Sequence, residues 1–108
     1  MKVSILVTFY NQKQFVDECL TSLVNIKDID YEVLVGDDGS DDGTYEVIKK
    51  YELEYPNLIK LFKMPRNPKV KYDVVHRASM NRLNLLEHSN GDFFVSWMAM
   101  ISLLMKIL

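Results

Sequence analysis

The chain has 108 residues, of which 48% are hydrophobic and 26% are charged, and its net charge at neutral pH is −2. This length allows a single domain with a modest core, and the composition is that of an ordinary globular protein. The charge argues against a nucleic-acid partner, because binding to phosphate backbones depends on a basic surface.

The single cysteine, Cys19, cannot form an internal disulfide, so a reducing compartment is expected. The apolar run at residues 93–105 is shorter than the roughly 20 residues that a membrane-spanning helix needs. We therefore expect a cytoplasmic protein, either free or peripheral to the inner face of the membrane.

The first half of the chain predicts two strand–helix units. Residues 2–8, rich in Val and Ile, predict a buried strand, and residues 12–25 carry apolar side chains at helical spacing. Asn11 and Gln14 have the spacing of a capping box at the start of this helix. Residues 31–35 predict a second strand, and residues 44–55 predict a helix that ends at Pro56.

The second half continues the alternation. Residues 58–64 predict a strand, and residues 73–88 predict a helix with Val75, Ala78, Arg82 and Leu85 on its inner side. Residues 92–96 predict a fourth strand, expected centrally beside residues 2–8. Helical crossovers require parallel pairing, so we predict an α/β protein with a Rossmann-like open parallel sheet of βαβαβαβ order.

An acidic loop, GDDGSDDG at residues 36–43, joins the second strand to the second helix. In an open parallel sheet, the carboxyl ends of the strands are where ligands bind, and the Tyr10-Asn11 loop would lie at the same edge. The simplest interpretation is a capping turn, in which Asp and Ser accept hydrogen bonds from free amides while Gly39 and Gly43 adopt positive φ.

Two ligand interpretations of this loop fail on spacing. A calcium loop of the EF-hand type needs a Glu at its twelfth position, which here is Ile48 or Lys49. No glycine-rich phosphate-binding motif is present. Adjacent carboxylates repel phosphate, and they suit hydrogen-bond donors such as a base imide, ribose hydroxyls or sugar hydroxyls.

Three segments resemble family 2 glycosyltransferases of the GT-A fold: VSILVTFYN at residues 3–11, EVLVGDDGSDDGT at 32–44 and NGDFFVS at 90–96. The resemblance covers about residues 2–96 in the family's order and spacing, and the acidic motif is its most specific part. It implies the N-terminal half of a GT-A domain that transfers a sugar from a nucleotide-diphosphate-sugar donor. The acceptor of the parent protein would be a saccharide or lipid-linked hydroxyl.

The resemblance also implies a set of site residues. The positions assigned to the nucleoside are Thr8, Tyr10, Asn11, Asp37 and Asp38. Thr8 stands where proline is common in the family. Arg77 and Asn81 match a region beside the diphosphate, where an arginine suits bidentate phosphate contacts, although Arg77 could equally be a solvated helix residue.

After its fourth strand the family carries an acidic D-x-D-type motif for Mg²⁺ or Mn²⁺, whereas this chain continues with Trp97-Met98 and apolar residues. Trp and Met have single codons. Shifted by one base, TGG-ATG-GCN-ATG-ATH becomes xTG-GAT-GGC-NAT-GAT, which contains the coding for L-D-G-D-D. We infer that residues 97–108 are an out-of-frame apolar tail on a partial domain, residues 2–96.

This inference predicts a chain that keeps only the nucleotide-binding half. It would have no metal ligands, acceptor half or catalytic base, and it would be inactive while its tail promotes self-association. The alternative is a noncatalytic α/β interaction module whose tail packs on a partner. A receiver-type phosphoacceptor fits less well, since its acidic positions hold Tyr10-Asn11 and Pro65-Arg66.

Overall fold

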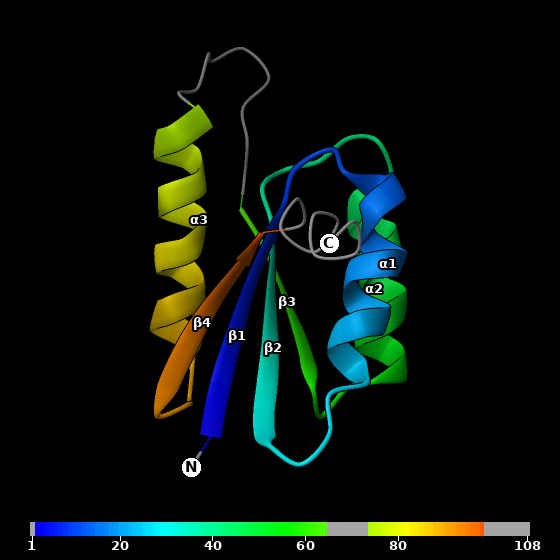
Figure 1. Ribbon diagram of the computed structural model, residues 1–108. Helices are drawn as coiled ribbons and strands as arrows, with labels where there is room; N and C mark the ends of the chain where they lie inside the picture. Colours follow the sequence, from blue (N-terminus) through cyan, green and yellow to red (C-terminus); the bar gives the residue numbers. More distant parts are fainter. Residues whose placement is uncertain (1, 65–73, 99–108) are drawn as a thin grey trace, which may run out of the picture.

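A computed structural model describes residues 2–64 and 74–98 of the chain. Its elements alternate as the sequence predicted, and the βαβαβαβ order is confirmed (Figure 1). In chain order the elements are β1 (Lys2–Phe9), α1 (Lys13–Val24), β2 (Asp30–Asp37), α2 (Thr44–Glu54), β3 (Ile59–Lys63), α3 (Val74–His88) and β4 (Phe93–Met98).

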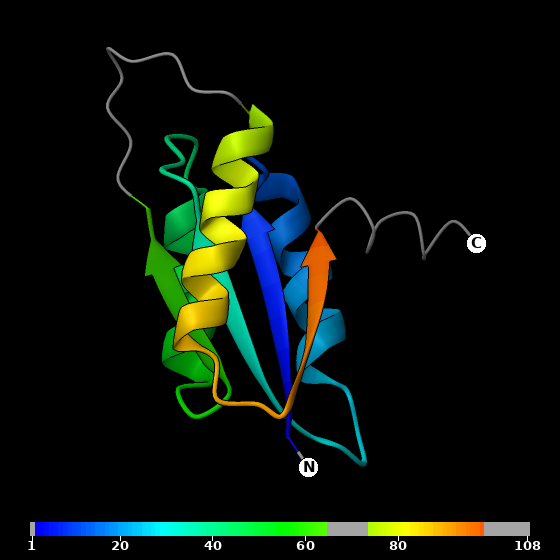
Figure 2. The same cartoon turned by 90° about the vertical axis from the view of Figure 1, so that its left-hand side faces the viewer.

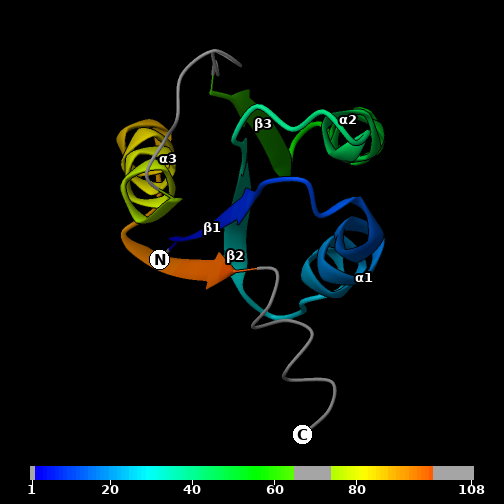
Figure 3. The ribbon, with the colours of Figure 1, turned by 90° about the horizontal axis from the view of Figure 1, so that it is seen from above.

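The strands form one parallel sheet in the order β3-β2-β1-β4. Helices α1 and α2 cover one face of the sheet and α3 covers the other, as the view from above shows (Figure 3). The side view shows α3 running along its face of the sheet (Figure 2). All strands are parallel, so their carboxyl ends lie at the same edge, where Phe9 of β1 is in register with Asp37 of β2.

The larger apolar cluster lies between the sheet and helices α1 and α2. Alternate residues of β1 and β2 supply the sheet side of this cluster, as the period of two along a strand requires. Its buried members are Ile5, Val7, Phe9, Val16, Cys19, Leu20, Leu23, Val33, Val35, Ile48 and Ile59. The Cys19 thiol is buried here, as expected for a core cysteine.

The α3 face of the sheet is smaller and more polar. Its apolar cluster consists of Leu6, Leu34 and Leu85 with Phe62 packed against it. Leu85 was expected on the inner side of α3, and this is confirmed. The prediction for Arg82 is wrong, because this side chain is only partly buried, whereas Val75 and Ala78 have side chains outside the described set.

The inner side of α3 instead carries two polar residues, Arg77 and Asn81, which precede Leu85 by eight and four positions and are both buried. Each has a partner on the β2 side: Arg77 pairs with Asp38, and Asn81 donates to the Gly36 carbonyl. Hydrophobic periodicity cannot detect a helix face that is buried through polar contacts. The helix was therefore predicted at the right place in the sequence, but the side that faces the sheet is rotated about the helix axis relative to the predicted one.

At the amino edge of the sheet, a buried carboxylate joins three segments of the chain. Glu32 on β2 is 2% exposed, and one of its oxygens accepts hydrogen bonds from the Ser4 hydroxyl and the Asn90 amide, both at 2.6 Å. Ser4 Oγ in turn accepts from the Gly91 amide at 2.8 Å. The Lys2 ammonium lies 3.8 Å from the other Glu32 oxygen. This network fixes the turn that leads from α3 into β4.

Strand β4 pairs with β1, as predicted, but it begins at Phe93 and continues through Met98. Trp97 and Met98 were expected in the tail, yet β1 extends far enough to pair with them at Val7 and Thr8. The expected central place is wrong within the described sheet, where β4 is an edge strand. The rest of the predicted tail, residues 99–108, lies outside the described residues.

Across residues 2–64 and 74–98, none of the helices has the length and apolar character needed to cross a membrane.

Candidate functional site

The loops that follow β1 and β2 are joined at the carboxyl edge of the sheet. The Asp38 amide donates to the Phe9 carbonyl at 3.0 Å, which continues the pairing of the two strands beyond Asp37. On the other side of β2, the Met64 amide donates to the Asp37 carbonyl at 2.8 Å. The end of β2 is thus held from both neighbouring strands.

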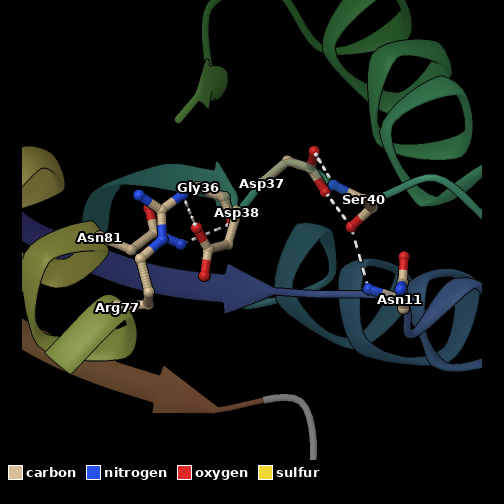
Figure 4. A network of polar contacts seen from close by, with 7 residues as sticks. All are labelled: Asn11, Gly36, Asp37, Asp38, Ser40, Arg77 and Asn81. Carbon is tan, nitrogen blue, oxygen red and sulfur yellow. Dashed lines mark hydrogen bonds and ion pairs between the residues drawn. The ribbon is translucent and has the colours of Figure 1, made fainter. Parts of the chain in front are cut away.

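A first hydroxyl relay joins the two loops through Ser40 (Figure 4). The Asn11 amide donates to Ser40 Oγ at 2.9 Å, and the Ser40 hydroxyl donates to Asp37 Oδ1 at 2.5 Å. The Ser40 amide donates to the second Asp37 oxygen at 3.1 Å. In return, the Asp41 amide donates to Asn11 Oδ1 at 2.9 Å. The Asp37 carboxylate is therefore engaged inside the chain.

A second relay repeats this pattern one residue further along. The Gln12 amide donates to Thr44 Oγ1 at 3.1 Å, and the Thr44 hydroxyl donates to Asp42. Asp42 also accepts from the Thr44 amide at 3.0 Å and from the Lys13 amide at 3.3 Å. One carboxylate thus accepts hydrogen bonds at the start of both α1 and α2, where free amides and the helix dipole favour an anion.

These contacts confirm the capping-turn interpretation of the acidic loop. Gly39 and Gly43 have φ of 73° and 97°, as expected. The capping box expected from Asn11 and Gln14 is wrong: Gln12 is the N-cap of α1 and makes no side-chain capping bond. The caps of α1 come from the acidic loop, which is distant in sequence, so local spacing could not reveal them.

The two structural aspartates differ in their electrostatics. Burial raises the pKa of the Asp37 carboxyl, although the Ser40 hydrogen bonds and the Lys63 charge act in the opposite direction. Slight burial also acts to raise the pKa of Asp42, but the hydrogen bonds that Asp42 accepts from Thr44 and Lys13 outweigh this effect, and the pKa is lowered. Asp42 is therefore an anion at the helix termini at neutral pH.

Asp38 faces α3, on the opposite side of the sheet from these relays. Its side chain is 8% exposed, and its carboxylate pairs with the Arg77 guanidinium. Just behind it, Asn81 Nδ2 donates to the Gly36 carbonyl at 3.2 Å. A Cβ on Gly36 would collide with the Asn81 side chain, so glycine is required for α3 to approach the end of β2 this closely.

A groove of about 480 Å³ opens beside this ion pair. It runs between the end of β3, at Lys63 and Met64, and the face of α3 that carries Arg77, Met80 and Leu83. Arg77 therefore forms part of the wall of an open groove although most of its side chain is covered.

The seven predicted site residues gather at the carboxyl edge and the adjoining part of α3. Thr8 is opposite Gly36 in the β1–β2 register and partly buried, and Tyr10 is 41% exposed. Asn11 and Asp37 are joined through Ser40, and Arg77 meets Asp38 (Figure 4). Asn81, at 1% exposure, contacts Gly36. Site residues that sequence analysis missed are Ser40, Asp42 and Thr44, for which the N-cap preference of Ser, Asp and Thr was the available signal.

No metal-binding set occurs in the part of the chain that the structure describes, since no three or more His, Cys, Asp or Glu residues there are grouped suitably. The acidic loop illustrates the reason. Asp37 and Asp42 accept hydrogen bonds from the chain, and Asp38 is paired with a cation. These residues do not form a ligand set for a divalent ion.

The family model described as Glycosyl transferase family 2 matches residues 4–99. The chain belongs to this family. The matched residues include the acidic loop, both relays and all seven predicted site residues.

Two curated relatives show how much of a glycosyltransferase the chain spans. It is 38% identical over 61 residues to a poly(ribitol-phosphate) beta-glucosyltransferase of Bacillus spizizenii, covering 55% of this chain and 10% of that protein. It is 30% identical over 92 residues to the putative glycosyltransferase EpsE of Bacillus subtilis, covering 85% of this chain and 30% of that protein. The chain thus spans less than a third of either relative.

Solved structures confirm the fold. The mannosyltransferase PcManGT from Pyrobaculum calidifontis, in complex with GDP-Man and Mn²⁺, superposes with a TM-score of 0.72 at 22% identity, covering 90% of this chain and 27% of that one. S. aureus TarS 1–349 in complex with UDP-GlcNAc superposes with a TM-score of 0.68 at 26% identity, covering 92% and 26%. The predicted Rossmann-like GT-A architecture is confirmed.

Proposed function

We propose that residues 2–96 are the nucleotide-binding half of a family 2 glycosyltransferase. The parent protein would transfer a sugar from a nucleotide-diphosphate-sugar donor to an acceptor hydroxyl on a saccharide or a lipid-linked molecule. The observation that supports this most directly is the placement of Asp38. Its backbone is fixed to the end of β1 and its carboxylate is turned to the α3 side, next to an open groove.

Asp38 would accept a hydrogen bond from the base imide or from a ribose hydroxyl. A carboxylate accepts about four hydrogen bonds, so the Arg77 pair and a ligand donor can share the group. The Arg77 guanidinium pairs with this carboxylate and supplies the opposite charge that a largely buried carboxylate requires. Ionised acceptors make hydrogen bonds about twice as strong as neutral ones.

The other predicted residues take roles that follow from their positions. Thr8, Tyr10 and Asn11 would line the nucleoside from the β1 side, where Tyr10 is the most exposed of the three. Asp37 would act through Ser40, and Asn81 through Gly36, since both are buried against these partners.

The diphosphate would be near Arg77 and away from the start of α1. Helix N-termini bind phosphate through free amides, but the amides of Gln12 and Lys13 already donate to Thr44 and Asp42. Of the two cations that line the groove, Lys63 and Arg77, the second is paired with Asp38. Its guanidinium has five donors, enough for a carboxylate and a phosphate oxygen together.

The relatives support a nucleotide-sugar donor. TarS 1–349 has been solved with UDP-GlcNAc and with UDP, and the match to it covers 92% of this chain at 26% identity. PcManGT, which supports the fold alone, holds GDP-Man and Mn²⁺. We expect a nucleoside diphosphate to occupy the same edge of the sheet in this chain.

Replacing Asp38 with alanine is expected to weaken nucleoside diphosphate binding by about 1.5–3 kcal/mol, because a charged hydrogen bond is lost. Isothermal titration of UDP and GDP into the 108-residue chain measures this, with and without Mg²⁺. Asp41→Asn removes a charge from the exposed tip of the same loop and serves as the matched control. Asp38→Asn keeps the side-chain shape in case Arg77 without a partner destabilises the alanine variant. Equal affinities for Asp38→Asn, Asp41→Asn and the native chain would contradict the assignment.

We also propose that the 108-residue chain is inactive by itself. A transfer needs a base for the acceptor hydroxyl and a cation for the leaving diphosphate. Mg²⁺ or Mn²⁺ would supply the cation in the parent protein, but the described acidic residues do not form a ligand set for such an ion. The proposal is supported by the chain spanning less than a third of the two curated relatives.

The expected result is that purified chain, incubated with UDP-GlcNAc or GDP-mannose and Mn²⁺, releases no nucleoside diphosphate above the level of an Asp38→Ala preparation. Release can be followed with a coupled nucleotide assay. Turnover that tracks the native chain and disappears in the variant would show that a different set of residues completes the site.

Residues 97–108 are proposed to be out of frame, on the codon argument made from Trp97 and Met98. Pairing of Trp97 and Met98 with β1 does not oppose this, because strand pairing uses the backbone and tolerates apolar side chains of either origin. Sequencing the coding DNA across the Ser96 codon decides it. The restored frame should continue with Asp-Gly-x-Asp-type acidic residues.

A noncatalytic interaction module is the second candidate, and the exposed apolar strand β4 favours it. In this case a partner protein would bind at β4, and the chain would not bind nucleotides. Titration with UDP and GDP, followed by NMR, therefore separates the two candidates. Only a glycosyltransferase domain should show chemical-shift changes at Tyr10, Asn11 and Asp38.

A further inference from the structure

Ser40 stands between the two loops of the site and contacts both. Its hydroxyl accepts from the Asn11 amide at 2.9 Å and donates to Asp37 at 2.5 Å, and its own amide donates to Asp37 at 3.1 Å (Figure 4). No ligand is needed to account for these bonds, because each donor has an acceptor within the chain. Ser40 is therefore positioned by a buried carboxylate and, in turn, positions a backbone amide.

The Asn11 amide belongs to a backbone that needs such support. Asn11 has a φ of 49°, which is the left-handed region that non-glycine residues seldom occupy, although asparagine tolerates it better than most. The conformation is held from both sides: Ser40 Oγ accepts from the Asn11 amide, and the Asn11 side chain accepts from the Asp41 amide. Without these bonds the loop would lose the contacts that compensate for its strained backbone.

Asp37 provides the fixed point of this relay. It is fully buried at the end of β2, whose backbone is paired to β1 and β3 on its two sides. The adjacent residue, Asp38, turns to the opposite face of the sheet and pairs with Arg77. The two carboxylates of the doublet therefore differ in their partners: Asp37 anchors the neighbouring loop through Ser40, and Asp38 pairs with Arg77, which lines the groove.

We propose that Ser40 is the positioning residue of the nucleoside site, holding the Tyr10-Asn11 loop in register with Asp38 through its link from Asp37 to the Asn11 amide. This inference rests on the proposed function for its ligand. In the free protein, the conformation of the Tyr10-Asn11 loop should already depend on Ser40 before any nucleotide binds. The two parts can be measured separately.

The first measurement is hydrogen exchange of the Asn11 amide in the free 108-residue chain, followed by NMR. Ser40→Ala is expected to increase its exchange rate at least tenfold, since the acceptor of this amide is removed. Ser40→Thr keeps the hydroxyl and should retain the native rate. Ser89→Ala is the matched control: it removes a serine hydroxyl that bonds a backbone carbonyl, at 2.7 Å to Leu86, at the opposite edge of the sheet.

The second measurement is the affinity of the same variants for UDP and for GDP. Ser40→Ala should weaken binding about tenfold, Ser40→Thr should restore it to within about threefold, and Ser89→Ala should leave it unchanged. Recovery by threonine distinguishes positioning through the hydroxyl from general damage to the fold. If Ser40→Ala does not fold, Ser40→Cys takes its place, because a thiol has nearly the same shape and is a weak donor and acceptor.

The outcomes separate the inference from the function on which it rests. Unchanged exchange of the Asn11 amide in Ser40→Ala overturns the positioning role, whatever the affinity. Faster exchange with unchanged affinity overturns it too, because the loop would then be irrelevant to the ligand. If the native chain binds neither UDP nor GDP, the proposed function fails and the role toward a nucleoside fails with it. The exchange data would then still decide whether Ser40 holds the loop.

Discussion

Replacing Glu32 with alanine is expected to cost about 3–5 kcal/mol of folding free energy, a large part of the stability of a domain this size. The carboxylate is the shared acceptor of the Ser4 hydroxyl and the Asn90 amide, both at 2.6 Å. Removing it leaves two donors in a site where the native side chain is almost fully covered, and buried donors without acceptors carry the full cost of desolvation. Chemical denaturation followed by circular dichroism measures the effect.

Glu54→Ala is the control for this substitution. Glu54 is an exposed residue near the end of α2, and such changes usually alter stability by no more than about 0.5 kcal/mol. Glu32→Gln should fall between the two, because the amide oxygen can still accept one hydrogen bond. Similar stability losses for Glu32→Ala and Glu54→Ala would show that the network at Glu32 does not hold the α3–β4 turn.

The same residue predicts a pH dependence. Burial acts to raise the pKa of Glu32, but hydrogen bonds from Asn90 and Ser4 and the charges of Lys2 and Lys60 outweigh it, and the pKa lies below its ordinary value. A depressed pKa in the folded state adds stability above the unfolded pKa, about 4.3, and this stability is lost as the pH falls through the folded value. The stability gap between native chain and Glu32→Gln should therefore be widest near neutral pH and narrow below about pH 4.

The architecture could be predicted because it depends on regularities of the sequence itself. Short runs of β-forming residues marked β1 and β2, and helical spacing marked α1. Crossovers that contain a helix allow only parallel pairing. The acidic loop could be recognised for the same reason, as its glycines and aspartates are adjacent in sequence. Positive φ at Gly39 and Gly43 followed from this local chemistry.

The contacts that build the site depend on residues far apart in sequence, and these were not predictable. Thr44 and Gln12 are separated by 32 positions, and Arg77 and Asp38 by 39. Nothing local distinguishes an arginine that turns inward to a carboxylate from one that faces solvent, and this is why the rotation of α3 was misjudged. The division of the Asp37-Asp38 doublet between two faces follows from the alternation of side chains along β2, once the pairing is known.

Strand β4 exposes a large apolar surface at the edge of the described sheet. Phe94 is 58% exposed, its neighbours Phe93 and Val95 are also exposed, and alternation places Phe94 on the opposite face from the other two. The strand carries no charged residue that would discourage pairing with another edge. We therefore expect the chain to self-associate, with β4 and the apolar residues 99–108 both contributing.

Removing residues 99–108 is expected to shift the chain toward the monomer in sedimentation velocity while costing little stability, because β4 and its pairing with β1 stay intact. Phe94→Lys in the shortened chain should remove most of the remaining association, since a lysine on an edge strand opposes pairing. Leu53→Lys, on the exposed side of α2, is the matched control and should leave the association unchanged. If removal of residues 99–108 instead unfolds residues 2–98, these ten residues are part of the evolved core. The proposal that they are out of frame would then be wrong, because a segment translated by accident has no reason to complete the packing of a domain.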